Sequence, residues 1–87
     1  MIVEHIVKKK KSNPIGILIA DQYDGAIHIG FSLCCKTDTF NETEGLNFAI
    51  DKMSAGIFHV PHSIERQFKR FTSHAIRYYR HEAAKTE

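Results

Sequence analysis

The sequence predicts an α+β fold in which an antiparallel β-hairpin is covered on one face by two α-helices. Two apolar runs are joined by Asp24-Gly25, a dipeptide that is typical of a hairpin turn. Two later segments repeat apolar residues at helical spacing. The length of 87 residues predicts a single domain, residues 1–87.

Residues 1–13 are expected to form a strand and a lysine-rich connection. Ile2–Val7 is apolar and β-branched, which favours a strand, although six residues are too few to separate strand from helix by periodicity. This strand would widen the hairpin to three strands. A run of four lysines follows, and Pro14 is expected to stop regular structure. Residues 14–87 then form a ββαα core.

The hairpin is predicted over residues 15–34. Its first strand is apolar on both faces and is therefore expected to be central and covered. Its second strand alternates large apolar side chains with small or polar ones, which is the period-two pattern of a strand. Within it, Gly30 indicates a bulge or a close approach by a neighbouring element. His28 and Ser32 are expected to face outward on a sheet side that the helices leave open, which would permit a homodimer.

A first helix is predicted over residues 42–55. Asn41 and Glu44 fit a capping box at its start, and Gly56 suits the left-handed residue that follows a helix. Gly45 costs about 1 kcal/mol relative to alanine inside a helix, which indicates a packing reason. The residues at helical spacing are Leu46, Ala49, Ile50 and Met53.

The last helix is predicted to begin near Ser63, its expected cap, and it carries the clearest pattern in the sequence. One arc is apolar and contains Ile64, Phe68, Phe71, Ala75, Tyr78 and Tyr79. The opposite arc contains Arg66, Lys69, Arg70, Ser73, Arg77 and Arg80. We expect at least one of the two tyrosines to be buried, and we expect His74 and His81 to be exposed.

Charge is segregated along the chain, although the formal net charge is only +2. Residues 1–13 carry four lysines against one glutamate, which gives +3. Residues 14–60 carry two lysines against six acidic residues, which gives −4, and residues 61–87 carry six cations against three glutamates, which gives +3. Such asymmetry concerns the choice of partner more than the fold.

The basic arc of the last helix is the leading candidate for function. Arginines at helical spacing bind phosphate backbones or acidic protein surfaces, although a merely solvated helix has the same pattern. The lysine run is either an electrostatic arm or a solvated loop. An acidic protein ranks slightly above nucleic acid as the partner, because the acidic middle would repel a wrapping duplex. The candidate binding residues are Arg66, Lys69, Arg70, Arg77, Arg80, Lys8, Lys9, Lys10 and Lys11.

Metal binding has weak support in the sequence. His59 and His62 have a ligand-like spacing and Cys34 and Cys35 offer thiolates, but no Cys-x-x-Cys or His-Glu-x-x-His motif occurs. A second group, Asp38, Glu42 and Glu44, could hold Mg²⁺ for phosphodiester chemistry, but helix N-terminal carboxylates are the plainer interpretation. We therefore expect no metal site and no cofactor.

Nucleophilic catalysis is also disfavoured. Ser32 lies four residues from His28, about 13 Å along a strand at roughly 3.3 Å per residue, which is too far for a direct hydrogen bond. No Gly-x-Ser-x-Gly motif occurs. We expect no catalytic residue and no enzymatic activity, and a small metal-dependent hydrolase is the least favoured alternative.

The chain has no apolar run of about 18 residues and no basic-then-apolar leader, so neither a membrane span nor a signal peptide is expected. Two adjacent cysteines, Cys34 and Cys35, cannot form a disulfide framework and point to a reducing compartment. The expected location is therefore the cytoplasm.

Five short motifs occur in order along residues 15–80: Gly16-Ile-Leu-Ile-Ala20, Ile29-Gly-Phe-Ser-Leu-Cys34, Asp38-Thr-Phe40, Gly45-Leu46 with Ala49, and Val60-Pro-His-Ser63. In these motifs the chain resembles a group of small uncharacterised bacteriophage early or accessory proteins. That group has no agreed activity, so no catalytic residue is carried over, and Met1–Lys11 lies outside the likeness. The resemblance implies a protein of the bacterial host cytoplasm that binds and redirects host machinery, including defence systems.

These observations predict a small non-enzymatic binding protein that engages a host protein through its basic helical face, as an inhibitor or anti-defence protein. The alternative is a nucleic-acid-binding module that uses Arg66, Arg70, Arg77 and Arg80.

Overall fold

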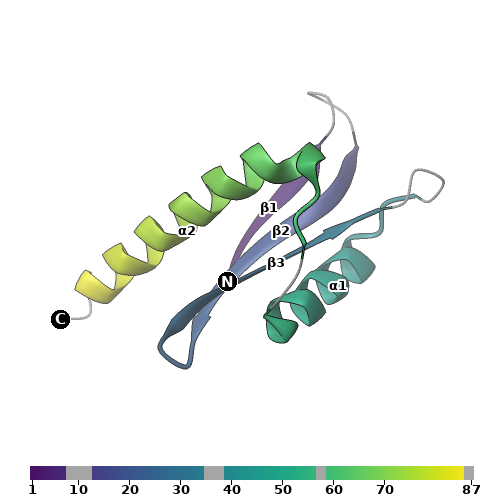
Figure 1. Ribbon diagram of the computed structural model, residues 1–87. Coiled ribbons are helices and arrows are strands. Elements are labelled where there is room, and N and C mark those ends of the chain that lie inside the picture. The colour runs from purple at the N-terminus through teal and green to yellow at the C-terminus, as the bar shows by residue number, and fades with distance from the viewer. Residues whose placement is uncertain (8–12, 35–38, 57–58, 86–87) are drawn as a thin grey trace.

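The structure is a computed structural model that describes residues 1–7, 13–34, 39–56 and 59–85, with side chains described as far as His81. Three strands form one antiparallel sheet in the order β1-β2-β3, and two helices complete the fold (Figure 1). The predicted α+β fold with a three-stranded sheet is confirmed. The elements are β1 (Ile2–Val7), β2 (Pro14–Tyr23), β3 (Ala26–Leu33), α1 (Glu42–Ala55), the 3₁₀ turn η1 (His62–Ile64) and α2 (Glu65–Lys85).

The two helices lie on opposite faces of the sheet, so the prediction that both cover one face is wrong (Figure 1). Along β2, Ile17 and Ile19 pack against α1, whereas Leu18 and Ala20 pack against α2. None of these four side chains is exposed to solvent. A strand that is apolar on both faces needs cover on both, and β2 therefore dictates three layers with the sheet in the middle.

The β2–β3 hairpin turns where the sequence predicts. Asp24 and Gly25 have φ values of 52° and 75°, and positive φ at both central residues is the signature of a type I′ turn. Pro14, expected to stop regular structure, instead begins β2 opposite Val7. The first position of a strand tolerates proline, because the missing N–H is not needed there.

α1 packs directly on β3, and the small residues of that strand allow the close approach. A Cβ atom added at Gly30 would collide with the backbone of Ala49 and Met53, which confirms that this glycine marks a close approach. Ser32 is buried, and its hydroxyl donates a hydrogen bond of 2.7 Å to the Gly45 carbonyl. The expectation that Ser32 faces outward on an open sheet is therefore wrong, because α1 covers that face.

Both ends of α1 are capped by the predicted residues. The Asn41 side chain accepts a 3.0 Å hydrogen bond from the backbone N–H of Glu44. Gly56 has a φ of 79°, and its N–H donates to the Lys52 carbonyl. A Cβ atom at Gly45 would press on the Phe40 ring, which is the expected packing reason for a glycine inside this helix.

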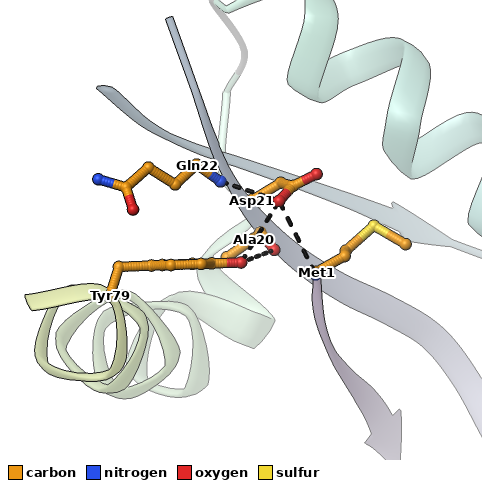
Figure 2. A network of polar contacts seen from close by, with 5 residues as sticks. All are labelled: Met1, Ala20, Asp21, Gln22 and Tyr79. Atoms are coloured by element: carbon orange, nitrogen blue, oxygen red, sulfur yellow. Dashed lines mark hydrogen bonds and ion pairs between the residues drawn. The ribbon is translucent and has the colours of Figure 1, made fainter. Parts of the chain in front are cut away.

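α2 is fixed to the sheet by its apolar arc. The chain enters it through η1, and Ser63 lies inside that turn rather than capping the helix. Tyr79 is buried, as expected for one of the tyrosine pair, whereas Tyr78 is 44% exposed. The Tyr79 hydroxyl donates a 3.1 Å hydrogen bond to the Ala20 carbonyl and lies 3.5 Å from an Asp21 carboxylate oxygen (Figure 2). Burial, reinforced by the Asp21 charge, raises the pKa of Tyr79.

Both helices also hold the edge strand β1, which the sequence predicts correctly. Gln67 of α2 donates hydrogen bonds to the Glu4 carboxylate at 2.8 Å and to the His5 carbonyl at 3.2 Å. On the other face, the His5 ring lies 2.7 Å from a Glu42 carboxylate oxygen at the start of α1. These contacts join residues more than thirty positions apart and fix the edge of the sheet relative to both helices.

Candidate binding surface

Four arginines of α2 form an exposed row that we call the α2 stripe: Arg66, Arg70, Arg77 and Arg80. The buried residues of the same helix, Phe71, Ala75 and Tyr79, lie on the opposite side and fix its rotation on the sheet. At 1.5 Å per residue the stripe extends about 21 Å along the helix axis. The structure therefore brings these predicted binding residues onto one surface.

The arginines of the α2 stripe have no acidic partner within the part of the chain whose side chains are described. The ion pairs found there involve other cations. Lys69, also predicted to bind, differs because its ammonium lies 3.2 Å from Glu65. Lys69, with a smaller contribution from His62, lowers the pKa of Glu65. The uncompensated charge on this face therefore belongs chiefly to the four arginines.

Three of the six acidic residues in the acidic middle lie on the other side of the sheet from the α2 stripe, whereas Asp21 lies beside Tyr79 of α2. Glu42, Glu44 and Asp51 are exposed on α1, which covers the opposite face of the sheet from α2. Lys52 of the same helix places its ammonium 3.9 Å from the centre of the Phe31 ring, so its charge is directed to the sheet rather than to those carboxylates. The sheet thus separates the exposed carboxylates of α1 from the arginines of α2.

Several other sequence predictions concern residues within or beside this surface. Ser73 lies in the middle of the α2 stripe and is exposed, and His74 and His81 are exposed as predicted. Lys8, Lys9, Lys10 and Lys11 lie outside the described residues, so their contribution to the surface stays a prediction.

The side chains weighed as metal ligands in the sequence are not gathered into a site in the part of the chain that is described. No group of three or more His, Cys, Asp or Glu side chains there could hold a metal ion. His62 lies 3.3 Å from Glu65 instead, and Cys34 is half-buried just after β3. Asp38 and Cys35 lie outside the described residues. No described helix is long and apolar enough to cross a membrane.

Sequence reasoning missed a second surface, on α1. Phe48 is 61% exposed and lies beside a hollow of about 500 Å³ between the end of β3 and the start of α1. Leu33, Phe40 and Glu44 also line this hollow. The sequence could have indicated this surface, because Phe48 is not among the apolar residues at helical spacing that pack α1 on the sheet.

Comparison with known proteins assigns no relative. No family model, curated protein or solved structure matches this chain. Function must therefore be inferred from the charged and aromatic residues of the two outer helices.

Proposed function

We propose that this protein is a small non-enzymatic binding protein that engages an acidic partner through the α2 stripe. Four exposed arginines without acidic partners among the described side chains are the observation that carries the proposal. Arginine binds phosphate and carboxylate groups in bidentate geometry, and it keeps its charge at any physiological pH. The helix that carries these arginines packs on the sheet through its buried arc, which leaves the row on the opposite, exposed side of the helix.

Nucleic acid is the partner class that the geometry favours. Protein interfaces generally have an apolar core, whereas a phosphate backbone is bound mainly by cations and polar side chains. At the centre of the α2 stripe, the exposed position in line between Arg70 and Arg77 is Ser73, a small polar residue. The sequence ranks an acidic protein first because the acidic middle would repel a duplex. Glu42, Glu44 and Asp51 are on α1, across the sheet from the α2 stripe, so these three carboxylates repel less strongly a ligand that approaches from the α2 side.

An acidic host protein is the second candidate. The bacteriophage resemblance favours it, and the same arginines would pair with carboxylates. In that case the protein would act in the cytoplasm of a bacterial host cell as an inhibitor of host machinery or of a defence system.

Binding to a fluorescent DNA duplex of about 20 base pairs, followed by anisotropy across a salt series, tests the nucleic-acid proposal. Four phosphate contacts predict that log K falls with log salt with a slope of about −3.6, and Arg70→Gln/Arg77→Gln should halve that slope. The matched control Asn13→Asp/Gln22→Glu changes two exposed positions and has the same net charge as the arginine variant. An equal reduction of the salt slope in the control would mean that net charge, not the α2 stripe, governs duplex binding.

A pull-down from nuclease-treated host lysate decides between the two partner classes. A stoichiometric protein that is retained by the wild type and lost with Arg70→Gln/Arg77→Gln, together with no duplex binding at low salt, would replace nucleic acid by the host-protein function. Duplex binding without such a protein supports the nucleic-acid function.

A further inference from the structure

A surface on α1 has no role in the proposed function. We call it the Phe48 patch, and it consists of Phe48 with the exposed carboxylates Glu44 and Asp51. Phe48 is the most exposed of the large hydrophobic side chains in the described part of the chain, which is an unusual environment for a phenylalanine. Neither carboxylate takes part in an ion pair among the described side chains. An exposed ring between two such carboxylates suits a partner that supplies cations on either side of a gap.

The α2 stripe has the matching arrangement of charge. In the Phe48 patch, the ring follows Glu44 by four residues and precedes Asp51 by three. On α2, Ser73 precedes Arg77 by four residues and follows Arg70 by three. The two spacings match those of the Phe48 patch when the helices run in opposite directions. The outer charges are therefore about 10.5 Å apart on each helix at 1.5 Å per residue.

We propose that the Phe48 patch of one copy docks antiparallel on the α2 stripe of a second copy of this chain. Glu44 then meets Arg77 of the second copy, Asp51 meets Arg70, and the Phe48 ring covers the small Ser73 side chain. Arginines that flank an aromatic ring also stack on it, so the ring and the charges reinforce each other. The hollow beside Phe48 gives the neighbouring Arg80 of the second copy space to enter next to Glu44.

The layered fold decides the kind of assembly that results. α1 and α2 lie on opposite faces of the sheet, so a copy that offers its Phe48 patch still has its own α2 stripe free. Such a head-to-tail contact produces open chains or rings rather than a closed two-fold dimer. This route differs from the homodimer through an open sheet face, which α1 excludes by burying Ser32. The inference does not depend on the proposed function, but both use Arg70 and Arg77, so a polyanion should dissolve the assembly.

Sedimentation at low and high salt provides the first test. At about 20 mM salt the weight-average mass should rise above the monomer mass of 10.0 kDa as concentration increases, without a plateau at the dimer. At about 0.5 M salt it should return to the monomer value, because screening weakens the ion pairs. A mass that stays at the monomer value at low salt up to millimolar protein would refute the proposal.

One exposed position separates this contact from nucleic-acid binding. Phe48→Ala removes the ring on α1 and leaves the α2 stripe unchanged. This variant should sediment as a monomer at low salt and should keep its duplex binding. Association that persists in Phe48→Ala would locate the contact elsewhere and overturn the proposed register.

A charge exchange tests the pairing directly. Arg70→Glu/Arg77→Glu makes the two contact positions on α2 acidic like those on α1, and Glu44→Lys/Asp51→Lys makes the two contact positions on α1 basic like those on α2. Each variant alone should be monomeric, and an equimolar mixture should associate, because every contact between unlike variants again joins opposite charges. Failure of the mixture to associate, with circular dichroism showing both variants folded, would contradict the pairing. The second variant keeps the α2 stripe, so its duplex binding tests the proposed function independently.

Discussion

At the residue scale, two small side chains of β3 determine how α1 sits on the sheet. In the sequence, Gly30 and Ser32 look like the solvent face of a half-buried strand. They are small because the backbone of a helix lies against them, and Ser32 is satisfied by a helix carbonyl rather than by water. A face of small residues is therefore ambiguous in a sequence, since solvent and a closely packed helix both tolerate it.

Gly30→Ala should lower the free energy of unfolding by about 3 kcal/mol, because the added methyl group forces α1 away from β3. Gly25→Ala is the matched control, since its Cβ meets nothing within 4 Å and only its positive φ opposes the change, at about 1 kcal/mol. Urea denaturation measures both. Equal losses in the two variants would mean that close packing at Gly30 is unimportant.

Tyr79→Phe should lower the free energy of unfolding by about 1 kcal/mol, because the hydrogen bond to the Ala20 carbonyl is lost. Tyr78→Phe should leave the free energy of unfolding nearly unchanged. The pKa of Tyr79 is raised above its ordinary value of 10.0 in the folded state. The protonated phenol therefore contributes stability that is complete below about pH 10 and is lost as the pH rises through the folded-state pKa. Thermal unfolding between pH 8 and 11 should show this alkaline loss in the wild type and less of it in Tyr79→Phe.

At the element scale, local patterns predicted the three strands and two α-helices of the described residues, but they missed the η1 turn and failed on how the helices are arranged. The Asp24–Gly25 turn, the Asn41 cap and the apolar arc of α2 each depend on neighbours within a few residues. An apolar arc shows that a helix packs on something, but it does not specify which face of the sheet receives it. The same holds for the candidate site. The helical spacing of the arginines predicted the α2 stripe, but the sequence could not show that the acidic residues of α1 lie on the other face of the sheet.

Asn41→Ala should lower the free energy of unfolding by about 1 kcal/mol, because the N–H of Glu44 loses its side-chain acceptor at the start of α1. Asn47→Ala, an exposed asparagine inside the same helix, is the control and should be neutral or slightly stabilising. Chemical denaturation of the two variants side by side makes the comparison. If the two variants unfold at the same denaturant concentration, the Asn41 cap does not contribute to stability.

Ser73→Arg should add one phosphate contact to the α2 stripe and make the salt slope of duplex binding steeper by about 0.9. Arginine is also a better helix former than serine, so the helix should be at least as stable. The salt series that measures the wild type applies unchanged. An unaltered slope would place the duplex away from the centre of α2.

At the scale of the whole molecule, a net charge of +2 conceals one basic and one acidic outer layer. Opposite charges on opposite faces give the molecule a large dipole, and net charge alone is a poor guide to what it binds. The sequence contained all of these charges, but only the position of the sheet between the helices determines that they do not cancel locally.

At pH 7 and low salt, the protein should be retained on both cation- and anion-exchange resins, because each resin contacts one layer. Arg70→Gln/Arg77→Gln should lose retention on the cation exchanger and keep it on the anion exchanger. Asn13→Asp/Gln22→Glu, which also has a formal net charge of zero, should still bind both. Identical elution of the two variants would show that net charge is sufficient.

The bonds that hold α2 also have a consequence for the order of folding. The β2–β3 hairpin joins strands that are adjacent in the chain, whereas the bonds from Tyr79 to Ala20 and from Gln67 to Glu4 span 59 and 63 residues. Contacts that close long loops form late, because their entropy must be overcome before they contribute. We therefore expect α2 to be the last element to dock during folding and the first to detach in the native ensemble. The helix that carries the arginines would then visit a released state in which its apolar arc is also accessible.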